Sequence, residues 1–246
     1  MTHPDDARMP LIEHLRELRS RLLWCVYTMV PAFAVSFLYS REIFDFLAAP
    51  MNDALRAGGG GSLAVLEFTE FFVVQMKVAG LAALFASAPM IAWQVWRFVA
   101  PGLYDTERRV VVPLALSSST LFVGGAVFCY YAIFRLGFPF FLEMNGPDIR
   151  AVLSVNSYLG MVTTMLVSFG LAFQLPVVVW FLARLGLVDA RDLIHGFRYA
   201  IVGIFIVAAI LTPSPDAFTQ ALMAGPLVVL YVVGIAVAAL STTKKR

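Results

Sequence analysis

Long apolar stretches separated by short polar segments constrain this chain more than any other feature of its sequence. A helix needs about 20 apolar residues to cross the roughly 30 Å of hydrocarbon in a bilayer. Only 14% of the residues are charged and the mean hydropathy is +0.82, whereas soluble domains carry roughly 25% charged residues. We therefore predict an all-α polytopic membrane protein, with one membrane domain over residues 1–246 and six transmembrane helices at about 22–39, 68–91, 110–134, 158–182, 199–211 and 217–240.

The last two predicted spans come from a single apolar region, residues 199–240, interrupted by the letters TPSPD at 212–216. Two prolines and an aspartate cannot remain unsatisfied in lipid, so we divide the region there. The alternative is one unbroken tilted helix. The fifth span then has about 13 residues and a length of roughly 20 Å, which is less than the hydrocarbon thickness.

Two further helices are predicted at the membrane surface. Leucines recur at steps of four, three and four near the start of the chain, a spacing that indicates one apolar stripe on a helix: Leu11, Leu15, Leu18 and Leu22. We interpret this segment as a short amphipathic helix that lies along the interface and leads into the first span. A second interfacial helix is predicted from Ile43 to Leu55, interrupted at Pro50.

Basic residues predict the orientation of the chain in the membrane. One set of connecting segments, which includes both termini and residues 93–113, holds 13 of the 18 lysines and arginines. Lys77 lies within a span, and the opposite set holds Arg41, Arg56, Arg135 and Arg150. This bias predicts that both termini and the 93–113 loop are cytoplasmic. The first apolar run has no A-x-A-like cleavage site after it and no transit peptide before it, which favours a retained anchor in a prokaryotic inner membrane.

Charged residues in the N-terminal segment and the 93–113 loop allow two interpretations. Glu17 lies four residues before Arg21, and Glu107 directly precedes Arg108 and Arg109. These residues can form local surface ion pairs, which are worth little individually. The two carboxylates can instead bind arginines from another chain. Spacing alone favours the local pairs.

Two polar side chains inside the predicted spans are candidates for a role in the membrane, Lys77 and Gln174. Lys77 lies on the same helical face as Glu70, and it either extends its ammonium toward the surface or contacts another span. Gln174 precedes Pro176, and we expect it to face protein or water and to form an interhelical hydrogen bond.

Catalytic and metal-binding motifs are absent from the sequence: it has no HExxH, no phosphate-binding glycine loop and no Cys/His cluster. We expect no enzyme activity and no cofactor or metal. Cys25 and Cys129 lie in different apolar runs and are interpreted as free thiols, and the net charge of +2 is too small to indicate nucleic acid. The alternatives are a secondary transporter, for which the halves show no repeat, and an intramembrane enzyme, for which the spans show no acid pair.

Four segments carry a resemblance to a known family. In family order and spacing, the chain resembles the TatC subunit of the twin-arginine protein translocase in the segments LIEHLRELRSRLL at 11–23, AAP at 48–50, SAPMIAWQVWRFVAPGLYDTERRVVVPL at 87–114 and LTPSPDAFTQ at 211–220. The resemblance implies a receptor and core for export of folded proteins, driven by the proton-motive force. It also implies a concave, glove-like bundle whose last two spans are short.

The resemblance further implies roles for individual residues. Glu17 and Glu107 match the acidic residues that hold the paired arginines of a signal peptide. Further matches to positions linked to signal recognition, assembly or docking of single-span TatA/TatB-type partners are Arg19, Gln94, Phe98, Pro50, Thr212 and Gln220. Self-association within the bilayer is also implied. Gln174 departs from the family, which commonly has glutamate there, so we expect a polar cavity residue without an ionisable proton.

Overall fold

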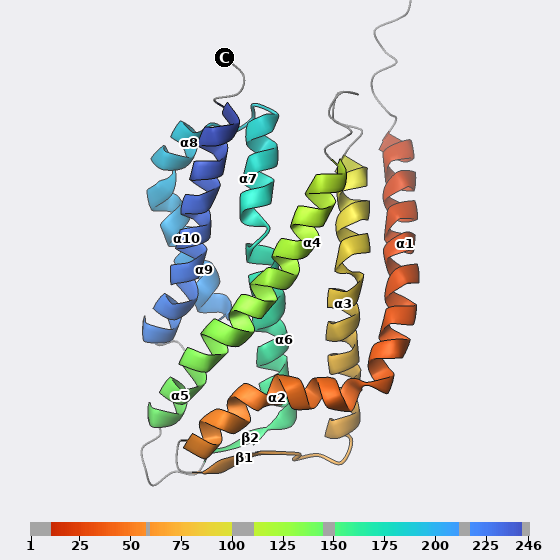
Figure 1. The fold of residues 1–246 in the computed structure, drawn as a ribbon, viewed down its shortest axis with the longest axis vertical. Coiled ribbons are helices and arrows are strands. Elements are labelled where there is room, and N and C mark those ends of the chain that lie inside the picture. Colours follow the sequence, from red (N-terminus) through yellow and green to blue (C-terminus); the bar gives the residue numbers. More distant parts are fainter. Residues whose placement is uncertain (1–10, 58–59, 100–110, 145–150, 212–216, 243–246) are drawn as a thin grey trace, which may run out of the picture.

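Long helices run side by side through the molecule, and one helix with a pair of short strands crosses one end of the bundle (Figure 1). The computed structural model describes residues 11–57, 60–99, 111–144, 151–211 and 217–242. We call the end where the first helix begins and the last helix ends the N/C end, and the opposite end the α2 end. The helices that run between the two ends include α1 (Leu11–Leu38), α3 (Glu70–Val99) and the α4 to α5 series, whereas α10 (Ala217–Thr242) runs from the N/C end only part of the way toward the α2 end.

α1 is one continuous helix of 28 residues, so the prediction of a separate interfacial helix before the first span is wrong. No glycine or proline lies between Leu11 and Val30 to break the hydrogen-bond ladder. The leucine stripe faces away from the bundle, because Leu15, Leu18 and Leu22 are exposed. The half-buried stripe, which starts at Glu17 and Arg21, lies toward α3, the helix against which α1 packs.

α2 (Ser40–Ala57) continues through Pro50, so the predicted interruption there is also wrong. Its apolar face includes Leu47, Met51 and Leu55, which are buried, and the helix packs against α3 and α5. Burial of such a face offsets the one backbone hydrogen bond that a proline removes.

The third apolar region extends ten residues beyond its predicted end. α4 (Val111–Phe128), a five-residue π-helix (Cys129–Ile133) and α5 (Phe134–Met144) follow one another without a break. The fourth apolar region is divided instead, into α6 (Val155–Ala172) and α7 (Leu175–Arg184). Pro176 lies in the first turn of α7, where its missing N–H removes no bond from that helix.

α8 (Ala190–His195) leads into α9 (Phe197–Leu211), and α10 packs against both α7 and α9. α9 and α10 are therefore separate helices and not one long tilted helix. α9 has 15 residues, or about 22 Å of helix. α10 has 26 residues, so it is longer than the short last span that the resemblance implied.

Five helical stretches of the described chain are long and apolar enough to cross a membrane, and Phe197–Ile210 is a shorter apolar helix. The largest buried cluster lies between α2, α3, α5 and α6 toward the α2 end, and it includes Phe134, Leu159 and Phe169. A smaller cluster around Trp96, Leu114 and Phe181 joins α3, α4 and α7.

A two-stranded parallel sheet at the α2 end was not predicted. β1 (Gly61–Ala64) pairs with β2 (Ala151–Ser154). The two strands lie in segments that the sequence indicated only as polar connections, and they are about 90 residues apart in the chain.

Candidate functional site

Charged and polar side chains meet between α1 and α3 near the N/C end. Arg21 Nη2 donates to Glu17 Oε1 at 2.7 Å, and Arg21 Nη1 donates to Gln94 Oε1 at 3.3 Å. The Glu17 and Arg21 side chains are 21% and 20% exposed, whereas Gln94 is 4% exposed. Glu17 thus forms the local ion pair that spacing favoured, and it still reaches the surface. We call Glu17, Arg21 and Gln94 the α1–α3 polar cluster.

An aromatic contact lies beside this cluster. The rings of His14 on α1 and Phe98 on α3 stack with their centroids 4.4 Å apart and their planes 22° apart. Arg19 is exposed on α1. The structure therefore places Glu17, Gln94 and Phe98 on adjoining parts of α1 and α3. Sequence reasoning predicted the pair of Arg21 with Glu17, but it missed the contact of Arg21 with Gln94 and the stacking of His14 on Phe98.

Glu107, the second predicted carboxylate, lies outside the described residues. Val99 at the end of α3 and Val111 at the start of α4 bound its segment, and both lie at the N/C end (Figure 1). Asp105 also lies in this segment.

Gln174 lines a cavity of about 360 Å³ between α3, α4, α6 and α7. Its Nε2 donates to the backbone oxygen of Ser118 on α4 at 2.8 Å. Trp96 Nε1 donates to the Ser118 hydroxyl at 2.7 Å, so two helices are tied to the same residue of α4. Most other lining groups are apolar, including Phe122 and Val178.

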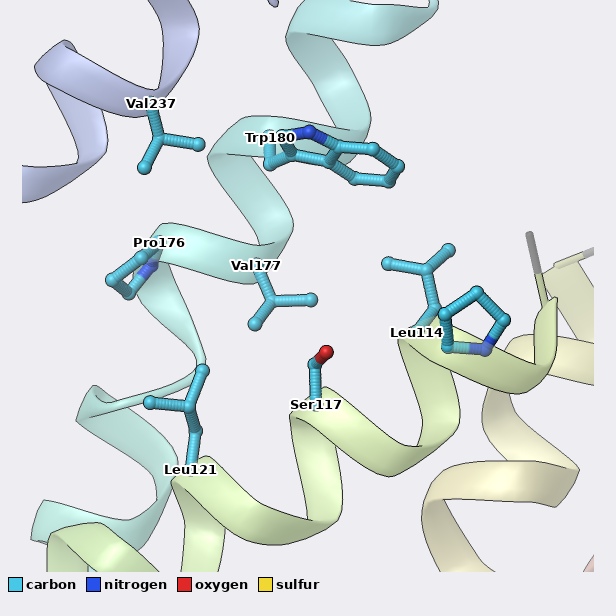
Figure 2. A pocket seen from close by; sticks show the side chains of 8 residues that line it. Leu114, Ser117, Leu121, Pro176, Val177, Trp180 and Val237 are labelled. Carbon is cyan, nitrogen blue, oxygen red and sulfur yellow. The ribbon is translucent and has the colours of Figure 1, made fainter.

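A second apolar hollow, of about 380 Å³, lies between α4, α7 and α10. Figure 2 shows Leu114, Ser117 and Leu121 of α4 on one side, and Val177 and Trp180 of α7 with Val237 of α10 on the other. Ser117 supplies the one hydroxyl group among the side chains drawn. The residues that line this hollow are mostly apolar, and none of them is charged.

Lys77 forms a polar contact with another helix, the second of the two predicted possibilities. Its Nζ donates to Asn156 Oδ1 of α6 at 2.6 Å. The nearby Glu70 is buried and accepts hydrogen bonds from four groups, Leu66 N, Glu67 N, Asn156 N and the Ser154 hydroxyl. Sequence reasoning noted Glu70 only as a neighbour of Lys77, because its partners from residues 154–156 are remote in the chain.

The residues expected to contact partner subunits are described only in part. Gln220 Nε2 on α10 donates to the Phe205 oxygen of α9 at 2.9 Å, so this side chain ties the last two helices together. Thr212 lies outside the described residues, and Pro50 is half-buried within α2.

The described residues hold no metal-binding cluster and no disulfide. Among the described residues, no cluster of three or more His, Cys, Asp or Glu side chains could hold a metal ion. Cys25 and Cys129 are free thiols. The polar groups are gathered instead at the two ends of an apolar helical bundle and at one interhelical cavity. The fold is that of a polytopic helical membrane protein.

Comparison with known proteins identifies the family. The sequence profile of TatC, the Sec-independent protein translocase protein, matches residues 13–226. A TatC protein from Koribacter versatilis is 36% identical over 97% of this chain and 88% of its own length. One from Campylobacter jejuni is 42% identical over 89% of both chains. A crystal structure of the twin-arginine translocase receptor TatC superposes with a TM-score of 0.82 at 34% identity, covering 93% of this chain and 99% of that one.

The chain belongs to the TatC family. The predicted helical membrane fold is confirmed by the structural match. Because the family consists of non-enzymatic translocase receptors, membership also confirms the predictions of a transport role and of no enzyme activity. The secondary-transporter and intramembrane-enzyme alternatives are set aside on the same ground.

Proposed function

We propose that the N/C end faces the cytoplasm and binds signal peptides that carry two consecutive arginines, with Glu17 and Glu107 as the carboxylates that receive them. The observation that supports this most directly is the position of Glu17. Its carboxylate is held by Arg21 at the surface of α1, beside the end of α3 from which the segment with Glu107 continues.

The chemistry of the two partners supports this assignment. A guanidinium group donates two parallel hydrogen bonds to a carboxylate, and an ammonium group cannot reproduce that fork. Two carboxylates on neighbouring segments therefore distinguish a paired arginine from a paired lysine. Phe98 and Arg19 lie around Glu17 and complete the signal-binding surface, and the buried Gln94 supports it from α3.

The orientation follows from the distribution of basic residues and from the fold. Arg16 and Arg19 at the start of α1, Arg97 at the end of α3, and Arg184 at the end of α7 lie at the N/C end. By the positive-inside rule this end is cytoplasmic, in a prokaryotic inner membrane with six spans. α9, at about 22 Å, is the span that the bilayer must thin to accommodate.

Partner subunits are proposed to dock near α9 and α10. Gln220 and Thr212 are the polar residues that the family resemblance points to, and the Gln220 side chain lies where α9 and α10 meet. The partners are single-span TatA/TatB-type proteins, with self-association of this chain in the complex. The sequence has no nucleotide-binding motif, and the family resemblance points to the proton-motive force as the source of free energy for transport.

Binding of a labelled twin-arginine signal peptide to the purified full-length protein tests the proposal. We expect Glu17→Gln and Glu107→Gln each to weaken binding by about 10- to 100-fold, the typical loss for a charge-assisted hydrogen bond. Asp105→Asn is the matched control for Glu107 and should bind within about twofold of the unchanged protein. Equal losses for Asp105→Asn and Glu107→Gln would overturn the assignment of Glu107.

A further inference from the structure

We infer that Arg21 is a positioning residue for signal recognition: it orients the Glu17 carboxylate by tying it to the buried Gln94 on α3. This inference rests on the proposed function of Glu17. It assigns to Arg21 and Gln94 an action through Glu17, and neither residue has to touch the signal peptide itself.

One guanidinium group connects three side chains from two helices. Its Nη2 contacts Glu17 Oε1 at 2.7 Å, one helical turn away on α1, and its Nη1 contacts Gln94 Oε1 at 3.3 Å on α3. The planar fork of arginine sets the angle between these two bonds. The position of Gln94 therefore determines where the carboxylate of Glu17 lies.

Gln94 is a rigid anchor because it is 4% exposed and lies in α3 two residues before Trp96, which is itself buried. Packing also holds the stem of Arg21, whose Nε is enclosed and has no hydrogen-bond partner within the described part of the chain. A surface glutamate on its own samples several rotamers and loses that freedom on binding. Arg21 removes this freedom before the signal arrives, which is the general way in which preorganisation raises affinity.

The same contact leaves Glu17 able to bind. Arg21 engages Oε1 alone, and a carboxylate offers about four acceptor positions. The remaining positions can receive an incoming guanidinium group. The competing interpretation is that Arg21 occupies the site and has to leave, which requires its 2.7 Å bond to Glu17 to break before a signal peptide binds.

Replacement of Arg21 separates the two interpretations. Arg21→Met keeps the stem and removes the guanidinium group, and we expect it to weaken binding of a twin-arginine peptide by about tenfold. Arg16→Met, which removes a positive charge from an exposed position of the same helix, should bind within about twofold of the unchanged protein. Binding of Arg21→Met that is unchanged or tighter would overturn the inference.

Two further measurements distinguish positioning from a general loss of structure. Arg21→Lys keeps the charge but not the fork, so it should also weaken binding and should reduce the preference for a twin-arginine over a twin-lysine peptide. An Arg21→Lys variant with the affinity and the peptide preference of the unchanged protein overturns the inference. If Arg21→Met does not fold, the Arg21→Lys variant alone tests the inference. In a Glu17→Gln background Arg21→Met should cause no further loss, whereas an additional tenfold loss shows that Arg21 acts elsewhere.

The outcomes also separate this inference from the proposed function. If Glu17→Gln does not weaken binding, the proposed role of Glu17 is wrong. If Glu17→Gln weakens binding and Arg21→Met does not, only the positioning role of Arg21 is wrong.

Discussion

The buried carboxylate of Glu70 connects segments that are remote in the chain. Its Oε1 accepts from the Ser154 hydroxyl at 2.6 Å and from Asn156 N at 2.8 Å, and its Oε2 accepts from Leu66 N and Glu67 N. It is 5% exposed. Through these bonds the start of α3, the chain after β1 and the junction of β2 with α6 are held at one point. A carboxylate accepts all four of these hydrogen bonds, and a side chain that carries a donor group cannot.

We therefore expect Glu70→Gln to destabilise the protein by about 2–4 kcal/mol, because the amide nitrogen faces N–H donors and leaves them unpaired. Thermal unfolding of the detergent-solubilised protein measures the effect. Glu67→Gln is the matched control, since Glu67 is exposed and contributes only its backbone N–H to this network. A melting temperature of Glu70→Gln equal to that of the control contradicts the structural role.

Gln174 provides the second prediction at the scale of a residue. Its amide donates to the Ser118 backbone oxygen inside a largely apolar cavity. Gln174→Leu removes the donor, and we expect a loss of about 1–3 kcal/mol in stability together with reduced transport and unchanged signal-peptide binding. Gln174→Glu is nearly isosteric and should be tolerated, because a protonated carboxyl can donate the same bond.

Measurements of melting temperature, transport and signal-peptide binding test both Gln174 variants. The matched control is Gln75→Leu, since Gln75 is a half-buried glutamine of α3 whose side chain forms no hydrogen bond with the described residues. Full transport activity of Gln174→Leu refutes the polar-cavity interpretation of this residue.

At the scale of elements, close contact between α4 and α6 depends on two small residues. A Cβ atom on Gly125 of α4 would lie 2.5 Å from the Phe169 backbone oxygen of α6, and one on Gly170 of α6 would lie 2.8 Å from the Phe122 ring. The nearest obstacle at Gly125 is backbone, whereas the nearest obstacle at Gly170 is the Phe122 ring, followed by the Phe122 backbone oxygen at 3.1 Å. The contact at Gly125 therefore sets how closely the two helices approach.

Gly125→Ala should lower stability by about 1–3 kcal/mol or more, because the helices have to move apart. The adjacent Gly124 is an internal control, since nothing lies within 4 Å of a Cβ built there. Gly124→Ala should be neutral or stabilising by about 0.5–1 kcal/mol from helix propensity alone. Thermal unfolding compares the two, and a Gly125→Ala variant as stable as Gly124→Ala would show that α4 and α6 separate easily.

At the scale of the whole molecule, the proposed six-span orientation, with both termini on one side, depends on α9 and α10 being separate helices. In a background without Cys25 and Cys129, a cysteine at position 214 should react with a membrane-impermeant reagent from outside the cell. A cysteine at position 241 should react only from inside. Outside labelling at position 241, or none at position 214, contradicts the proposed six-span orientation.

Interactions within single segments explain what could be predicted from the sequence. The length of each apolar run and the spacing of its residues act within one segment, so the helical membrane class and the approximate position of most helices followed from them. The proline and aspartate residues at 212–216 separated α9 from α10 for the same reason. The candidate site residues of α1 and α3 came from the family resemblance, through two motifs that are each one continuous stretch of the chain.

Contacts between remote segments decided the rest. α2 continues through Pro50 because its buried face packs against α3 and α5. The local sequence pattern, which predicted an interruption, contains no information on this packing. The β1–β2 pairing and the four donors around Glu70 join residues about 85 or 90 positions apart, and no local periodicity encodes them. The tie from Glu17 through Arg21 to Gln94 likewise exists only because α1 packs on α3. The sequence by itself determined which segments are helical, because hydrophobic transfer and backbone hydrogen bonding are satisfied within a segment; tertiary structure alone decided which polar groups meet, because a buried polar group is satisfied by whatever donor or acceptor the packing brings to it.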